Sequence, residues 1–209
     1  PPNLSLIVSG GHTMLVRVNA VADYEILGST KDDAAGEAFD KVGKMLGLPY
    51  PGGPIIDQRA TKGNPKAFDF PRSMLGSGDY HFSFSGLKTS MANQLGKLGE
   101  AAEDATTIDD LCASFQAAVV DVLVKKTIKA AKEFGISKIT VSGGVSCNSG
   151  LREQMSDACQ RRNLDLHLAT PSYSTDNAAM IAYAAACRIH AGIGQSDLNT
   201  DINPNLKLV

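Results

Sequence analysis

The 209-residue sequence contains no tryptophan, and aromatic residues make up only 6% of it. Neither sign of charge dominates, because 20 Lys and Arg residues stand against 22 Asp and Glu residues. The resulting net charge of −2 gives no indication of nucleic-acid binding from bulk charge. No apolar run approaches the ~18 residues that a membrane-spanning helix needs, so no membrane partner is expected.

Metal-binding and redox motifs are also scarce. The four cysteines, at positions 112, 147, 159 and 187, form no CxxC pair, which disfavours zinc ribbons and thioredoxin-like sites. The four histidines are scattered and form no HExxH motif. Unpaired cysteines suit a reducing compartment and predict a cytoplasmic protein. The start, Pro1-Pro2-Asn3, has no basic leader, so we expect a chain cut at a domain boundary and no secretory signal.

Hydropathy patterning predicts an α/β protein. Strands are expected at 4–9, 13–18, 24–27, 138–142 and 165–168, and helices at 34–46, 54–61, 87–95, 107–134, 148–162 and 178–190. The first two strands are close enough to form a hairpin. We expect three sections: strands over 1–33, a mainly helical insertion over 34–134, and an α/β part over 135–209.

Two Gly-Gly turns follow predicted strands. In Ile7-Val8-Ser9-Gly10-Gly11, the glycines expose backbone N–H groups that could hold a phosphate or carboxylate, although Gly-Gly in a hairpin is most often only a turn. Gly143-Gly144 stands between a strand and a helix, where a flat ring or phosphate could approach the backbone. Asn148 follows it with both a donor and an acceptor. Close packing of strand and helix is the alternative for this second turn.

Acidic residues offer two further candidates. Four acids stand at 32, 33, 37 and 40, and the first three could simply match the positive end of a helix dipole. Asp40 falls in mid-helix, next to the apolar face, so it needs a partner: a ribose hydroxyl or merely Lys41. Asp176 precedes a helix of small residues and could cap it or ligate a metal ion.

Basic residues gather on two predicted helices. Lys125, Lys126, Lys129 and Lys132 share one helix, and Arg161-Arg162 end another. They could contact RNA phosphates, or they could form solvated outer faces.

Six segments, in this order, resemble the TsaD family of tRNA adenosine threonylcarbamoyltransferases, once described as O-sialoglycoprotein endopeptidases. They are Ser9–Thr13, Asp32–Lys41, Tyr50–Pro54, Phe82–Thr89, Ser142–Asn148 and Ser174–Asn177. The resemblance covers nearly the whole chain and looks bacterial or organellar. It implies the second (C-terminal) lobe of an actin-like ATPase, Hsp70 and sugar-kinase (ribonuclease H-like) fold with a helical insertion. The N-terminal lobe would lie upstream of residue 1.

The family transfers a threonylcarbamoyl group from threonylcarbamoyl-adenylate to N6 of the adenosine beside the tRNA anticodon. By resemblance, Ile7, Val8, Ser9, Gly10 and Gly11 would line the threonylcarbamoyl-phosphate region. The nucleoside would be held by Asp40, Gly53 and Asp57 on one side and by Asn148 on the other. Asp176 would ligate one divalent metal ion, iron or zinc, whose histidine ligands would come from upstream of residue 1.

The same resemblance implies TsaB and TsaE as partners, together with tRNA. Because a mixed anhydride already has a good leaving group, we expect no enzyme nucleophile, and we expect Cys147 to be a packing residue rather than a catalytic one. Two other functions stay open: a metalloendopeptidase, as the older family name suggests, and a non-catalytic scaffold like TsaB. The isolated chain is expected to be inactive.

Overall fold

A computed structural model describes residues 2–194, 199, 201 and 208. Its elements follow in the order β1 (Asn3–Val8), β2 (Thr13–Ala20), β3 (Asp23–Ser29), α1 (Ala35–Met45), α2 (Gly52–Ala60), α3 (Ser85–Leu98), η1 (Gly99–Glu103), α4 (Ala105–Glu133), β4 (Lys138–Ser142), η2 (Gly144–Cys147), α5 (Ser149–Gln160), β5 (Asp165–Leu168), η3 (Pro171–Tyr173) and α6 (Ala178–His190). Every predicted strand and helix is present, with shifts of a few residues at the ends.

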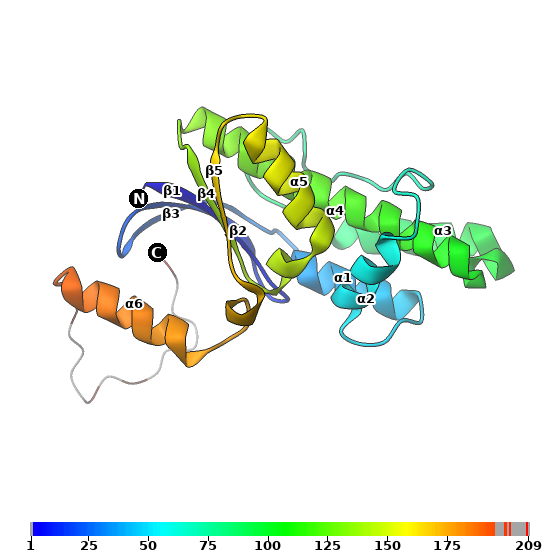
Figure 1. The fold of residues 1–209 in the computed structure, drawn as a ribbon. Helices are drawn as coiled ribbons and strands as arrows, with labels where there is room; N and C mark the ends of the chain where they lie inside the picture. Colours follow the sequence, from blue (N-terminus) through cyan, green and yellow to red (C-terminus); the bar gives the residue numbers. More distant parts are fainter. Residues whose placement is uncertain (1, 195–198, 200, 202–207, 209) are drawn as a thin grey trace.

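One mixed sheet organises the fold, with strand order β3-β2-β1-β4-β5 (Figure 1). β1 and β2 form the expected antiparallel hairpin, in which Leu6 pairs with Leu15. β4 pairs with β1 in parallel, so that Leu6 also faces Val141, and β5 extends the sheet in parallel. The carboxyl ends of β1 and β4 therefore meet at one edge of the sheet, where ligands of α/β proteins usually bind.

The long helix α4 forms the centre of the core. Its predicted apolar face, Leu111, Phe115, Val119, Val122 and Leu123, is buried. The Phe115 ring packs edge-on against Phe39 of α1, with centroids 5.1 Å apart, which is a favourable aromatic geometry. Buried residues from the sheet, α1 and α5 join the same cluster. The three predicted sections therefore share one hydrophobic core. The division of the chain into these sections stays a prediction.

The start of α4 lies earlier than the sequence indicated. Asp104 caps the helix by accepting hydrogen bonds from the backbone N–H groups of Thr106 (3.0 Å) and Thr107 (3.1 Å). The acids expected to start the helix hold other segments instead. Asp109 binds Arg59 of α2 at 2.7 Å, and Asp110 accepts from the backbone N–H of Asn64 at 2.6 Å. The helix ends as predicted, with Gly135 at φ +63°.

A second capping interaction joins two distant segments. Asp32 lies before α1, yet its carboxylate accepts from the backbone N–H groups of Phe84 (2.8 Å) and Ser85 (3.2 Å), at the start of α3. It also accepts from the hydroxyls of Ser83 and Ser85. Despite partial burial, which alone raises it, the pKa of Asp32 is lowered because these hydrogen bonds stabilise the charged form. Asp32 therefore matches the dipole of α3 rather than that of α1.

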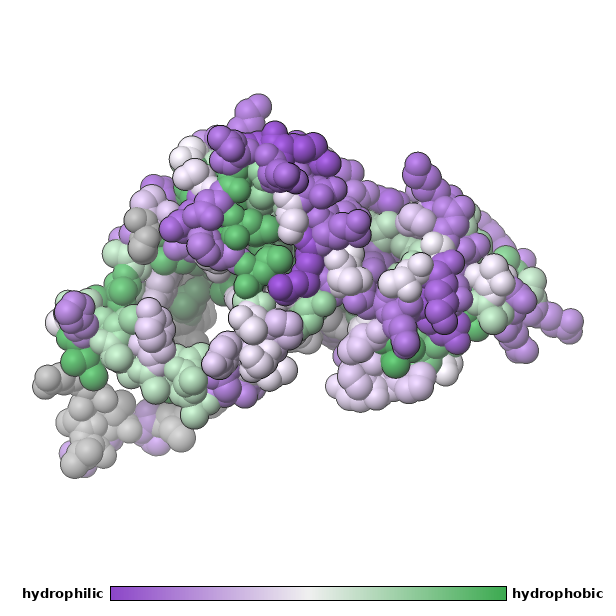
Figure 2. All heavy atoms as spheres, viewed as in Figure 1, coloured by the Kyte–Doolittle hydropathy of each residue, from purple (hydrophilic) through white to green (hydrophobic). Residues whose placement is uncertain are grey.

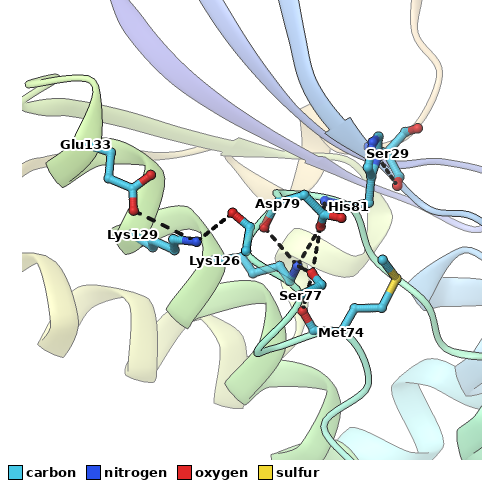
Figure 3. Close-up of polar contacts among 9 residues, drawn as sticks. Ser29, Met74, Ser77, Asp79, His81, Lys126, Lys129 and Glu133 are labelled. Carbon is cyan, nitrogen blue, oxygen red and sulfur yellow. Dashed lines mark hydrogen bonds and ion pairs between the residues drawn. The ribbon is translucent and has the colours of Figure 1, made fainter.

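Hydrogen bonds from Lys126, a buried lysine of α4, hold the loop that precedes α3 (Figure 3). The ammonium group of Lys126 donates to Ser77 Oγ (3.1 Å), to the Asp79 backbone carbonyl (3.1 Å) and to Asp79 Oδ1 (3.3 Å). Its side chain is only 1% exposed. Desolvation lowers the pKa of Lys126 even though Asp79 opposes this. Lys126 is therefore a structural residue and is excluded from the solvated basic face that the sequence suggested.

The Asp79 carboxylate predicts an acid-dependent loss of stability. Its pKa is lowered to about 2 by hydrogen bonds from Ser77, the His81 backbone and Lys126. A lowered pKa means that the stabilisation is complete above about pH 4 and disappears as the pH falls toward about 2. Asp79→Asn should therefore unfold at lower urea concentration than the wild type at about pH 5, and the two should converge near about pH 2. The fully exposed Asp69 provides the control, as Asp69→Asn. A gap that stays constant over this pH range would contradict the assignment.

Helix α6 stands apart from the sheet in Figure 1, and none of its residues is buried. Its exposed large apolar residues are Met180, Ile181, Tyr183 and Ile189. Figure 2 shows this helix as a mostly apolar surface at the lower left. Within the described residues, no helix has both the length and the apolar content that crossing a membrane requires. The tail at 201–209, for which no period was predicted, lies largely outside the described residues.

Candidate functional site

A cavity of about 540 Å³ opens between α1, α2 and η2, at the edge of the sheet where β1 and β4 end. Its lining is Gly10, Gly36, Phe39, Asp40, Pro51, Gly53, Pro54, Asp57, Gly144, Val145, Cys147, Asn148 and Thr175. Five residues that the sequence analysis selected, Gly10, Asp40, Gly53, Asp57 and Asn148, are among them. Apolar rings and methyl groups surround a few polar atoms, which is the usual composition of a small-molecule site.

Glycines set the shape of this cavity through close backbone contacts. Gly36, at the start of α1, donates its N–H to the Ser9 carbonyl at 3.1 Å, and a Cβ there would lie 2.6 Å from that oxygen. Gly43 of α1 faces Gly52 of α2, and a Cβ on either would be about 3 Å from the opposite backbone. Gly143, at φ +94°, packs on Val8, where a Cβ would lie 2.2 Å from the carbonyl oxygen. These contacts bring α1, α2 and the ends of β1 and β4 together.

Asp40 is placed at the cavity by the start of α2. Its Oδ1 accepts a hydrogen bond from the backbone N–H of Gly52 at 2.8 Å. Among the described residues, its Oδ2 has no hydrogen-bond partner. Lys41, the alternative partner, turns to Asp33 (2.7 Å) and Glu37 (2.9 Å), and these hydrogen bonds raise the pKa of Lys41. Pairing of Asp40 with Lys41 is therefore wrong, and one oxygen of Asp40 remains available.

Asp57 is engaged by the start of α5. Its Oδ2 accepts from the backbone N–H of Ser149 at 2.9 Å, and its Oδ1 accepts from the Ser149 hydroxyl at 2.7 Å. The side-chain amide of Gln116 donates to the same Oδ1 at 3.0 Å. The carboxylate thus already occupies the positive end of the α5 dipole. A ligand phosphate is not expected at that helix end.

Asn148 caps α5 rather than standing in its first turn. Its Oδ1 accepts from the backbone N–H of Leu151 at 2.9 Å, and its Nδ2 donates to Gln116 Oε1 at 2.6 Å. The side chain is buried at the cavity wall. Gln116 and Ser149 were not predicted from the sequence. A glutamine inside the apolar stretch of α4 was an available signal, because a buried amide needs partners.

The first glycine turn contributes one of its predicted residues to the cavity lining. Gly10 lines the cavity, whereas Ile7, Val8, Ser9 and Gly11 do not. Ser9 Oγ accepts from the backbone N–H groups of Gly11 (3.3 Å) and His12 (3.0 Å), which organises the β1–β2 turn. No atom lies within 4 Å of the Cβ position of Gly10 or Gly11. The backbone of this turn is therefore accessible to a ligand.

Asp176 is not the cap of α6. The neighbouring Asn177 caps that helix, accepting from the backbone N–H of Met180 at 3.0 Å. Asp176 is exposed and follows Thr175, which lines the cavity. The described residues contain no group of three or more His, Cys, Asp or Glu side chains that could hold a metal ion. Asp176 could supply one carboxylate ligand, and the described residues do not complete a metal site around it.

The cysteines differ sharply in environment. Burial raises the pKa of Cys112 to about 12, so its thiol stays protonated and inert. Cys147 is exposed and lines the cavity, so it is not the packing residue that the sequence predicted. No group that would activate it as a nucleophile is bonded to it among the described residues.

The basic residues of α4 and α5 line a separate groove of about 600 Å³ between these helices. Three of them are paired with acids: Lys125 with Asp121, Lys129 with Glu133, and Arg161 with Asp157. Within the described part of the chain, this leaves Lys132 and Arg162 as the groove's basic residues without an acidic partner. The groove therefore has a mixed rather than a strongly positive character.

Together, these groups form a cavity that suits a nucleoside with an attached anionic group. An apolar wall, Phe39, Pro51, Pro54 and Val145, can cover a flat ring. The free oxygen of Asp40 can accept from a hydroxyl. The exposed backbone N–H groups of Gly10 and Gly144, one in each glycine turn, can donate to an anion.

Comparison with known proteins gives the chain a family. Residues 1–183 match the family model for TsaD, the tRNA N6-adenosine threonylcarbamoyltransferase. The chain is similar to the protein of that name from Geotalea uraniireducens (strain Rf4), at 55% identity over 87% of this chain and 52% of the relative. It is also similar to the one from Polaromonas sp. (strain JS666 / ATCC BAA-500), at 49% identity over 99% of this chain and 60% of the relative. The chain thus spans somewhat more than half the length of these curated relatives.

A solved structure supports the expected fold. The crystal structure of T. kodakarensis HypF superposes with a TM-score of 0.53 at 15% sequence identity, covering 81% of this chain and 21% of that one. At this identity the likeness concerns the fold alone. The mixed α/β architecture expected from the sequence is confirmed, and the match over residues 1–183 shows that the chain belongs to the TsaD family of tRNA N6-adenosine threonylcarbamoyltransferases.

Proposed function

We propose that this chain is the nucleotide-binding half of an acyltransferase that forms threonylcarbamoyladenosine in tRNA. The observation that carries the proposal is the convergence of Gly10, Asp40, Gly53, Asp57 and Asn148 on one cavity in a chain of this family. The substrate would be threonylcarbamoyl-adenylate, whose acyl group passes to N6 of the adenosine beside the anticodon while AMP leaves. The protein would act in the cytoplasm, with TsaB and TsaE as partners.

The residues divide the substrate between two ends of the cavity. Asp40 would accept from a ribose hydroxyl through its free Oδ2, and Asn148 would donate from the opposite wall. Because Asp57 already neutralises the start of α5, the phosphate would lie at the other end, against the exposed backbone N–H of Gly10, whereas the Gly11 N–H already donates to Ser9 Oγ. Ile7, Val8 and Ser9 would support this turn from behind.

Little covalent assistance is required for such a transfer. A carbamoyl–phosphate mixed anhydride already has a good leaving group, so the site has to orient the carbonyl carbon and stabilise the departing phosphate. A bound iron or zinc ion would supply Lewis-acid polarisation, with Asp176 as one ligand and histidines from outside this chain as the others. The exposed Cys147 has no role in this scheme.

A segment exchange tests the function. Residues 1–183 would replace the matching segment of the Geotalea uraniireducens relative, and the chimera would be incubated with threonylcarbamoyl-adenylate and unmodified tRNA. Nucleoside mass spectrometry should detect threonylcarbamoyladenosine. A chimera carrying Asp40→Ala serves as the control and should form much less product. A folded chimera that forms none, beside an active unexchanged relative, would contradict the proposal.

A further inference from the structure

A directed chain of hydrogen bonds runs behind the cavity from α5 to α2. The Leu151 N–H donates to Asn148 Oδ1, Asn148 Nδ2 donates to Gln116 Oε1, and Gln116 Nε2 donates to Asp57 Oδ1. The distances are 2.9, 2.6 and 3.0 Å. Gln116 lies on the central helix α4 and is the one link that contacts both cavity residues.

The direction of this chain is dictated by chemistry. An ionised carboxylate accepts hydrogen bonds and cannot donate, so Gln116 must turn its NH₂ group toward Asp57. The carbonyl oxygen of Gln116 then faces Asn148, so Asn148 must donate to it from its own NH₂ group. The remaining Asn148 oxygen caps α5. Each amide is thereby held in one of its two orientations.

Gln116 itself does not line the cavity, and it is 93% shielded from solvent. A second observation shows that its position is built into the fold. A Cβ at Gly150 would lie 2.9 Å from Gln116 Nε2 and 3.4 Å from Asn148 Oδ1. The glycine thus leaves the space that the Gln116 amide occupies between α4 and α5.

We propose that Gln116 is a positioning residue that presents Asp57 as an acceptor and Asn148 as a donor to a nucleoside in the cavity. This inference rests on the proposed nucleotide-binding function. A residue of α4 would then determine which cavity side chain donates and which accepts. Without Gln116, the Asn148 Nδ2 group loses its acceptor, and Asp57 loses one of the donors that orient it. Both side chains then sample orientations that do not fit the ligand.

Substitution of the amide by an acid gives a distinctive signature. Gln116→Glu places a second carboxyl group about 3 Å from Asp57, so the two must share a proton and one pKa rises. Above that pKa the two charges repel, and below it the introduced carboxyl can donate to Asp57 as the amide did. Adenosine is the probe, because its own protonation lies well below the range used.

Adenosine affinity would be measured calorimetrically at about pH 8 and about pH 5.5. The wild type should change little between them. Gln116→Glu should bind about tenfold more weakly at the higher pH and recover part of this loss at the lower pH. Gln116→Met should bind more weakly at both, and Gly150→Ala should weaken binding although Gln116 is intact. Gln154→Glu, an acid for the same amide in the outer α4–α5 groove, should match the wild type.

Two results would overturn the inference. One is a folded Gln116→Glu variant whose adenosine affinity equals that of the wild type at both pH values. The other is independent of ligand: in ¹⁵N NMR spectra, the side-chain amide signals of Asn148 should shift in Gln116→Met toward those of an exposed asparagine, and unchanged signals would exclude positioning. If the wild type binds no adenosine, the nucleotide-binding proposal fails, while the NMR result still decides the role of Gln116.

Discussion

Gly143→Ala is expected to lower the free energy of unfolding by about 2–6 kcal/mol, from backbone strain and overpacking of about 1–3 kcal/mol each. Gly143 adopts φ +94° and ψ 166°, a conformation that is essentially restricted to glycine. A Cβ would also lie 2.2 Å from the Val8 carbonyl oxygen, and backbone atoms cannot move aside cheaply. Urea unfolding followed by circular dichroism measures the loss.

The adjacent glycine is a matched control for this substitution. No atom lies within 4 Å of the Cβ position of Gly144, so Gly144→Ala should cost less than about 1 kcal/mol. Gly144 lines the cavity, and the added methyl group can still reduce ligand affinity without reducing stability. Equal stabilities of the two variants would show that β1 and β4 do not meet as described.

Asp40→Ala is expected to weaken AMP binding by roughly 10- to 150-fold, which corresponds to about 1.5–3 kcal/mol for a hydrogen bond to a charged group. The reason is that the variant removes Oδ2, the oxygen of this carboxylate that has no hydrogen-bond partner among the described residues and lies beside the cavity. Asp40→Asn keeps an oxygen for the Gly52 N–H and should lose less affinity. Calorimetric titration of the three proteins with AMP provides the measurement.

The ribose assignment can be separated from general damage to the site. If Asp40 accepts from a ribose hydroxyl, the wild type should prefer AMP over 2′-deoxy- or 3′-deoxy-AMP, and Asp40→Ala should lose that preference. Asp33→Ala is the control, because Asp33 precedes the same helix but pairs with Lys41 outside the cavity. A variant that binds weakly yet retains the full deoxy discrimination would refute the contact.

Local patterns were sufficient for most elements of the fold. The apolar spacing of α4 and the bounds of β4, β5 and α6 were predictable, because each depends on residues within the element itself. Caps were less predictable. Asp32 serves a helix more than fifty positions away, and Asp109 was taken for part of a helix start although it binds Arg59. Such partners are determined by tertiary packing, which a local pattern does not contain.

The candidate site divides in the same way. The glycine turns and acids marked the cavity, since these residue types expose backbone or need a partner wherever they occur. The hydrogen bonds among these residues could not be predicted from the sequence, because the side chains of Asp57 and Asn148 are connected through Gln116, which comes from a third element. Asp176 and Asn177 illustrate the limit, because either can cap a helix and only the backbone geometry distinguishes them.

The close glycine contacts of α1 also determine which positions around the cavity can accept a larger side chain. On the α1 side, side chains at Gly36 or Gly43 would collide with backbone at 2.6 and 2.9 Å, so that wall cannot be rebuilt by substitution at those positions. Elsewhere in the lining, the Cβ positions of Gly10 and Gly144 are open, and that of Gly53 meets its nearest neighbour, Phe39 Cβ, only at 3.9 Å. Engineered selectivity for smaller or differently shaped ligands should therefore be sought at these three positions, while the α1 wall is left unchanged.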